Sequence, residues 1–162
     1  MQSATLCYLL RPESEEVLLI RKKRGLGEGK FVGPGGKVED GETPSECVVR
    51  EVEEEIRVTP RDPEKVGEFR FIFGDEPRMF VHVFRAEEFA GEPEPTPEAD
   101  PEWFDYESVP YDEMWEDDRY WLPHLLDGET FAGEFVFDAE GDELREWAVE
   151  TGVREVDAIE TF

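Results

Sequence analysis

The stretch "GGKVEDGETPSECVVREVEEEIRV", residues 35–58, combines a glycine-rich bend with a strongly acidic run. Thr43, Pro44 and Glu46 have the pattern of a helix N-cap, a first helical residue and the residue that closes a capping box. We therefore expect a helix that begins after Thr43 and runs to about Arg57.

Three carboxylates lie on one face of this expected helix. Glu51, Glu54 and Glu55 are spaced i, i+3 and i+4, so their like charges destabilise the helix unless something compensates. Mg²⁺ accepts a few carboxylates and keeps its other positions for water and phosphate oxygens. The glycine bend allows close backbone approach, with amides that meet an anion or a carbonyl that joins the metal. An acidic stripe is also typical of a solvated helix face, so both interpretations stay open at this point.

The spacing of the fixed residues favours the metal. The chain resembles the Nudix signature G-x5-E-x7-R-E-U-x-E-E-x-G-U, where U is aliphatic, over the box 36–58 at these residues: Gly36, Glu42, Arg50, Glu51, Val52, Glu54, Glu55 and Val58. Arg57 is the departure, because the signature has glycine there. The resemblance implies an α/β (α+β) Nudix fold, in which a mixed central β-sheet lies between helices. It also implies hydrolysis of a phosphoanhydride by metal-activated water.

The resemblance further implies roles for single residues. Three glutamates are similar to the divalent-metal ligands of the family: Glu51, Glu54 and Glu55. One of the last two is also similar to its general base. The Gly36 backbone resembles the carbonyl ligand, and Glu98 a further acidic residue close to the metals. Arg50 and Glu42 resemble the ion pair that holds the loop against the helix. The implied cofactor is Mg²⁺, with Mn²⁺ as an alternative.

A more specific resemblance extends over roughly residues 4–140. The segments "KKRGLGEGKFVGPGGKVEDGET", "VGEFRFIFGDEPRMFVHVF", "WFDYESVPYDEMWEDDRYWLP" and "FAGEFVFD" are similar to the MutT homologues that hydrolyse oxidised purine nucleoside triphosphates such as 8-oxo-dGTP. In that branch two adjacent aspartates and an asparagine bind the base in an aromatic pocket. The resemblance places these residues near the base or sugar: Trp115, Asp117, Asp118, Thr5, Lys22 and Leu26. Val32 stands where the branch has its asparagine, and valine cannot hydrogen-bond a base.

Asp117 and Asp118 have a clear physical role if both face a purine. Two aspartates held together push one pKa upward, and the protonated group donates a hydrogen bond while the ionised group accepts one. In an acidic protein the same "EDD" is also typical of a solvated helix start.

A basic cluster, "RKKR" at residues 21–24, precedes the glycine-rich loop. It would attract a triphosphate and partly cancel the acidic field of the protein. Charge that blocks pairing of an edge strand is the alternative interpretation.

The composition favours one acidic domain. The chain has 162 residues, 38% of them hydrophobic, with 17 basic and 43 acidic side chains and a formal net charge of -26. We expect a single domain, 1–162, with a polar tail from roughly residue 150 to 162. The charge repels polynucleotides and anionic membranes, so we expect no nucleic acid polymer and no membrane as partner, whereas a small nucleotide is not excluded. Together with the resemblance, this leads us to expect a small nucleotide substrate and a monomer.

The acidity itself is explained by solubility in a salt-adapted, halophilic cytoplasm, where salt screens the repulsion between carboxylates. The N-terminus, "MQSATLCYLLRPESEE", has no basic region before its short apolar run and does not resemble a signal peptide. We therefore expect a cytoplasmic protein.

Apolar, β-branched-rich runs predict the first two strands, and alternation of apolar and polar residues predicts the later hairpin. We expect the following elements: paired strands at 4–10 and 16–23, a hairpin of 65–74 and 79–89, a long ordered surface loop at 90–102, a strand, a turn and one helix over 103–128, and a further strand pair at 130–141.

Together these patterns predict a magnesium-dependent Nudix pyrophosphohydrolase that releases pyrophosphate from an oxidised purine nucleoside triphosphate and so clears damaged nucleotides. A Nudix hydrolase of another nucleoside diphosphate derivative, such as ADP-ribose, a nucleotide sugar or a dinucleotide, is the alternative. A catalytically silent nucleotide-sensing domain is the third, although such a domain has no need for three intact glutamates.

Overall fold

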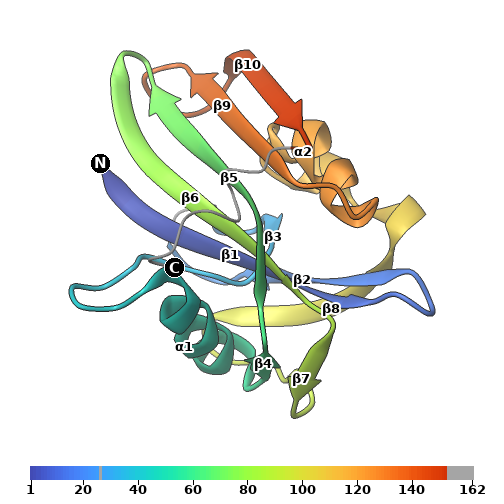
Figure 1. Cartoon of the computed structure of the whole chain (residues 1–162). Helices are drawn as coiled ribbons and strands as arrows, with labels where there is room; N and C mark the ends of the chain where they lie inside the picture. The colour runs from blue at the N-terminus through green and yellow to red at the C-terminus, as the bar shows by residue number, and fades with distance from the viewer. Residues whose placement is uncertain (26, 153–162) are drawn as a thin grey trace.

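The computed structural model describes residues 1–25 and 27–152 (Figure 1). Their helices and strands occur in this order: β1 (Gln2–Arg11), β2 (Glu16–Lys22), β3 (Phe31–Val32), α1 (Pro44–Ile56), β4 (Thr59–Arg61), β5 (Glu64–Phe73), β6 (Glu76–Ala86), β7 (Glu88–Ala90), β8 (Ala99–Asp105), α2 (Asp118–Leu126), β9 (Phe131–Phe137) and β10 (Leu144–Thr151). Two 3-10 turns, Tyr106–Ser108 and Tyr111–Glu113, connect β8 to α2. Within these ranges no helix has the length and hydropathy of a membrane span.

One large mixed sheet organises the molecule. Its strand order is β10-β9-β5-β6-β1-β2-β3, and β8 also pairs with β2. Strand β1 runs parallel to β6, and β5 runs parallel to β9. The predicted pairing of the first two strands holds only next to their turn, at Leu10↔Val17 and Arg11↔Glu16. Beyond the turn they separate, because β1 pairs with β6 and β2 pairs with β8.

Alternate side chains of the central strands pack into two different cores. Cys7 and Leu9 of β1 join the cluster that includes helix α1, whereas Tyr8 and Leu10 join the cluster that includes helix α2. The two helices lie on different sides of the sheet (Figure 1). The predicted mixed sheet between helices is thus confirmed, and the two-residue period of a strand explains how one sheet supports both layers.

Helix α1 begins and ends where the sequence predicts. The Thr43 side chain accepts a hydrogen bond of 3.1 Å from the Glu46 N–H, and the Glu46 carboxylate accepts one of 2.9 Å from the Thr43 N–H. At the other end, Arg57 is the C-cap, with φ 63° and ψ 32°. Its N–H donates to the Glu53 carbonyl at 3.0 Å. The position where the signature has glycine is therefore left-handed, a conformation that costs a non-glycine residue about 1 kcal/mol.

The proline-rich segment forms a shorter loop than predicted. Strand β7 includes its first residue, Ala90, and strand β8 already begins at Ala99, so the loop spans residues 91–98. The prediction of loop up to residue 102 was wrong because this part pairs with β2, beginning with Ala99 opposite Lys22.

Residues 130–141 contain one strand, not the predicted pair. Strand β9 ends at Phe137, and its partner β10 begins only at Leu144, after a turn in which the Asp138 N–H donates to the Glu143 carbonyl at 2.9 Å. Strand β10 continues to Thr151 and so includes the first two residues assigned to the polar tail. The tail from residue 153 onward lies outside the described residues.

Candidate functional site

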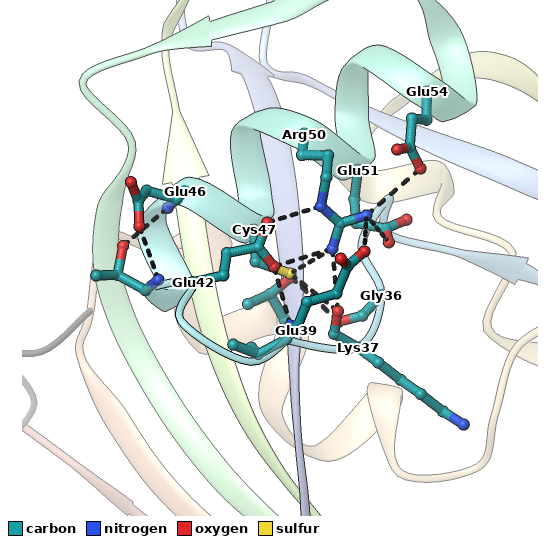
Figure 2. Close-up of polar contacts among 12 residues, drawn as sticks. Gly36, Lys37, Glu39, Glu42, Glu46, Cys47, Arg50, Glu51 and Glu54 are labelled. Atoms are coloured by element: carbon teal, nitrogen blue, oxygen red, sulfur yellow. Dashed lines mark hydrogen bonds and ion pairs between the residues drawn. The ribbon is translucent and has the colours of Figure 1, made fainter.

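The guanidinium group of Arg50, a residue of helix α1, is surrounded by oxygen atoms of the helix and of the glycine-rich loop (Figure 2). Its Nε and Nη2 atoms donate to the two oxygens of Glu42 at 2.7 and 3.0 Å, which forms the predicted ion pair in a two-point geometry. Nη1 donates to Glu51 at 2.8 Å, and Nη2 donates to the Lys37 carbonyl at 3.1 Å. The hydrogen bond from Arg50 lowers the pKa of Glu42 to about 2. Arg50 thus holds the loop against the helix.

The three glutamates of the helix face have different surroundings. Glu55 is 5% exposed and accepts a hydrogen bond of 2.8 Å from the Gly35 N–H. Burial raises the pKa of Glu55 to about 8 and also raises the pKa of Glu51. Glu54 is the exposed member, with its carboxylate 3.5 Å from Arg50. A cation would relieve the cost of ionising the two less exposed carboxyl groups.

The glycine-rich loop approaches the site so closely that side chains do not fit. A Cβ on Gly36 would lie 2.4 Å from the Glu51 carboxyl carbon, and a Cβ on Gly35 would lie 1.9 Å from the Thr5 carbonyl oxygen. The Gly36 carbonyl, predicted as a metal ligand, accepts a 2.8 Å hydrogen bond from the Thr5 N–H. The Cys47 Sγ lies 3.7 Å from the same oxygen. This carbonyl is therefore directed towards strand β1.

Glu98 lies at the end of the loop formed by residues 91–98. Its carboxylate accepts a 3.0 Å hydrogen bond from Arg24, and its negative charge contributes to the raised pKa of both Glu51 and Glu55. The structure thus brings this residue, which is distant in the sequence, close to the two glutamates of helix α1.

A pocket of about 220 Å³ begins at the buried end of this acidic cluster. Glu55 lines it together with Gly33, Gly35 and Gly36 of the loop. Its other lining residues include Tyr8, Phe71, Phe73, Met79, Val81, Trp115, Asp117, Asp118 and Phe137. The indole of Trp115 lies beneath the Lys30 ammonium, 5.5 Å from the ring centroid, which is a cation–π distance. An aromatic, largely apolar pocket therefore adjoins a cluster of carboxylates.

Asp117 and Asp118 are buried polar side chains that line the pocket, at 1% and 5% exposure. Oδ2 of Asp117 accepts a 2.8 Å hydrogen bond from the Trp121 indole, whereas its Oδ1 has no partner among the described residues. Burial raises the pKa of Asp117 to about 6. Burial, followed by the charge of Asp117, raises the pKa of Asp118 well above its usual range. The pair therefore offers one protonated and one readily ionised carboxyl group.

Some of the other residues expected near the base or sugar line the pocket. Lys22 and Val32 line the pocket, as does Thr5. The Thr5 hydroxyl, however, lies 3.2 Å from the Cys47 Sγ and 3.4 Å from the Gly36 carbonyl, so it is occupied on the helix α1 side. Leu26 lies outside the described residues.

The basic cluster of residues 21–24 is mostly paired within the protein. Arg21 binds Glu113 at 3.0 Å, Lys23 binds Asp100 at 2.8 Å and Arg24 binds Glu98 at 3.0 Å. Lys22, which lines the pocket, is thus the member placed to meet a ligand.

Sequence reasoning did not assign the aromatic wall of the pocket. Phe71, Phe73 and Phe137 line it, together with Met79 and Val81. The signal was present, because Phe71 and Phe73 are two residues apart on β5 and therefore share a face, as Met79 and Val81 do on β6. The pattern shows that such residues share a face but not which face borders a cavity.

Comparison with known proteins places this geometry in a family. The family model described as NUDIX domain matches residues 1–125. The chain is 42% identical over 136 residues to the oxidized purine nucleoside triphosphate hydrolase of Danio rerio, with 83% of this chain and 87% of the relative covered. It is 40% identical over 134 residues to the protein of the same name from Mus musculus, with 82% and 85% covered.

A solved structure shows the same similarity. The crystal structure of the mutator MutT protein from Bacillus halodurans superposes with a TM-score of 0.81 at 31% sequence identity, and covers 93% of this chain and 98% of its own. The 8-oxo-dGTP diphosphatase of Escherichia coli strain K12 is 33% identical over 86 residues, with 52% of this chain and 66% of the relative covered. The chain belongs to the Nudix family and is a Nudix hydrolase homologous to the oxidised purine nucleoside triphosphate hydrolases.

Proposed function

We propose that the protein hydrolyses an oxidised purine nucleoside triphosphate, such as 8-oxo-dGTP, to the monophosphate and pyrophosphate, and thereby removes damaged nucleotides. One observation carries this proposal. The buried pair Asp117 and Asp118 lies in the same aromatic pocket as Glu55, so a base-binding site and an acidic cluster are continuous. A nucleotide whose base enters the pocket would extend its phosphates towards helix α1.

The aspartate pair supplies hydrogen bonds to the base. Asp118, whose raised pKa favours the protonated carboxyl group, donates, while Oδ1 of Asp117, which has no partner among the described residues, accepts. A purine edge that presents an acceptor beside a donor satisfies both groups. Trp115 adds an aromatic face against which the base stacks.

The carboxylates of helix α1 suit a divalent cation. Glu51, Glu54 and Glu55 are hard oxygen donors, and burial raises the pKa of Glu51 and Glu55, so a bound cation would favour their ionised forms. We infer Mg²⁺, with Mn²⁺ as a substitute, and Glu98 as a further ligand. A bound ion would supply charge neutralisation for the phosphates and activation of water. Glu54 or Glu55 would accept the proton of the attacking water.

A backbone carbonyl of the glycine-rich loop completes this donor set. The sequence pattern assigns it to Gly36, but that oxygen already accepts the Thr5 N–H at 2.8 Å. The Gly35 carbonyl accepts no hydrogen bond from the described residues, and the Gly35 N–H binds Glu55. We therefore propose Gly35 as the better placed carbonyl ligand.

Steady-state kinetics with 8-oxo-dGTP, dGTP and ADP-ribose tests the substrate assignment. We expect kcat/KM to be highest for 8-oxo-dGTP and to require Mg²⁺. Asp118→Ala should lower kcat/KM for 8-oxo-dGTP about tenfold to a hundredfold, because it removes hydrogen bonds in a desolvated pocket, and should affect ADP-ribose much less. Asp112→Ala, on a side chain 97% exposed, is the matched control. Equal losses for all three substrates would contradict base recognition by the pair.

Hydrolysis of another nucleoside diphosphate derivative is the second candidate. The observation in its favour is Val32, which lines the pocket and offers no hydrogen bond to a base. A wild-type preference for ADP-ribose over 8-oxo-dGTP would establish this alternative. A protein that binds nucleotides but hydrolyses none of them with Mg²⁺ would instead be a sensing domain.

We also propose that the protein works as a monomer in a salt-adapted cytoplasm and that polynucleotides are not substrates. The support is the formal net charge of -26, which repels both polyanions and further copies of the chain. Light scattering at low and molar salt measures the oligomeric state, and a stable dimer under both conditions would contradict the first part.

A further inference from the structure

The loop formed by residues 91–98 covers the C-terminal end of helix α1. The Glu94 N–H donates to the Ile56 carbonyl at 3.0 Å, and the Thr96 hydroxyl donates to the Glu55 carbonyl at 2.7 Å. Carbonyls in the last turn of a helix have no partner within the helix. The loop therefore supplies hydrogen-bond donors to the carbonyl groups of the last helical turn, which includes Glu55 and its buried carboxylate.

The same threonine fixes the backbone of Glu98. The Thr96 N–H donates to the Ala99 carbonyl at 2.9 Å, and the Ala99 N–H donates back at 3.3 Å, so the two residues close a four-residue turn. The Glu98 N–H donates to the Thr96 hydroxyl at 3.2 Å. Pro97 occupies the second position of this turn, where its fixed φ restricts the backbone. Thr96 itself is only 7% exposed.

A third set of contacts joins this turn to strand β2. The Lys23 ammonium donates to the Thr96 carbonyl at 2.8 Å, and the Lys23 N–H donates to the Glu98 carbonyl at 3.0 Å. The preceding residue, Lys22, lines the pocket. Thr96 therefore lies where the helix end, the acidic loop and the pocket strand meet.

We propose that Thr96 is a positioning residue that fixes the Glu98 carboxylate relative to Glu55 and so completes the divalent-cation site. The inference rests on the metal-dependent function proposed above. The hydroxyl is the group that matters, because it donates to the helix and accepts from Glu98 at the same time. Valine has the same shape but does neither, whereas serine does both.

Titration of Mn²⁺ into the full-length protein without nucleotide tests this role directly. We expect Thr96→Val to raise the Kd for Mn²⁺ about fivefold to tenfold, the effect of losing one or two net hydrogen bonds, and Thr96→Ser to stay within about twofold of wild type. At saturating Mn²⁺, KM for the nucleotide should be unchanged. Thr151→Val, an exposed threonine on strand β10, is the matched control. Thr96→Ala replaces Thr96→Val if the valine variant does not fold.

A double mutant separates positioning from general stability. If Thr96 acts through Glu98, Thr96→Val should raise Kd no further in a Glu98→Gln background. A lower Tm with an unchanged Kd in Thr96→Val, or equal effects with and without the Glu98 carboxylate, would overturn the proposal. A wild type that hydrolyses nucleotides while Thr96→Val binds Mn²⁺ normally would overturn this inference alone. A wild type that binds no Mn²⁺ would overturn it together with the proposed function.

Discussion

The Gly35 N–H donates a hydrogen bond of 2.8 Å to the buried carboxyl group of Glu55, and this contact joins the glycine-rich loop to the last turn of helix α1. One hydrogen bond does not offset the desolvation of the carboxylate, so its pKa is raised to about 8. The group is therefore largely protonated at neutral pH when no cation is bound. A cation bound at the proposed site would replace this proton.

Glu55→Gln should inactivate the enzyme and stabilise the metal-free protein. We expect kcat to fall at least about a hundredfold, because a ligand or base is lost. The pKa of Glu55 is about 8 in the folded protein, above the usual 4.5. Its contribution to the free energy of unfolding is therefore full below pH 4.5 and is lost as pH rises through 8. The glutamine variant avoids that loss, so its advantage should reach on the order of 5 kcal/mol above pH 8.

Urea unfolding with EDTA at several pH values measures this advantage. Glu53→Gln, on an exposed residue of the same helix, is the matched control and should show neither effect. Equal stability of wild type and Glu55→Gln at pH 9 would contradict the buried, uncompensated carboxylate.

Val32→Asn should sharpen base selectivity. Val32 lines the pocket that contains Asp117 and Asp118, and an asparagine there adds a donor and an acceptor for the base edge. We expect the ratio of kcat/KM for 8-oxo-dGTP over dGTP to rise about tenfold, the value of one good hydrogen bond. Val32→Ala removes bulk without adding a polar group, so an equal change of the ratio in both variants would point to pocket size instead.

Arg57→Gly should stabilise the protein by about 1 kcal/mol, because glycine adopts the left-handed C-cap conformation without steric cost. Arg57→Ala loses the same charge but keeps the Cβ, so it serves as the control. Thermal unfolding of the three proteins should place Arg57→Gly a few degrees above the other two. A glycine variant no more stable than the alanine variant would show that this cap is unstrained.

The acidic surface should make stability depend on salt. With a formal net charge of -26, the folded chain repels itself, and screening between low and molar KCl should raise Tm. Sucrose of matched osmolality stabilises without screening and is the control. A Tm that stays flat or falls as KCl increases would remove salt adaptation as the reason for the acidity.

Local sequence rules predicted helix α1 and the acidic cluster well. The Thr43 and Glu46 capping box follows from local spacing, and the Arg50–Glu42 ion pair, which the Nudix resemblance implied, also joins residues close in the chain. Pairing between distant strands could not be predicted in this way. The parallel contact of β1 with β6 and the extension of the sheet by β10 depend on competition between partners, which only the whole fold decides.

The hydrogen-bond partners of single groups also could not be predicted from the sequence. The signature assigned a ligand to Gly36, but its carbonyl is taken by the Thr5 N–H, a bond that exists because residues 36–38 lie along β1. The sequence predicted no role for Thr96, which lies in a segment rich in prolines and acidic residues. Its two-way hydroxyl contacts with Glu55 and Glu98 become visible only when the helix end and the loop are seen together.

The parallel pairing of β5 with β9 also sets the order in which a growing chain becomes functional. Helix α1 and its carboxylates are synthesised early. Strand β9, which pairs with β5 and includes Phe137, is synthesised late. Until β9 is synthesised, this edge of β5 has no partner strand, and Phe69 and Phe71 lack the Phe135 ring that packs against them in the complete chain. The pocket lined by Phe71, Phe73 and Phe137 therefore closes only near the end of translation.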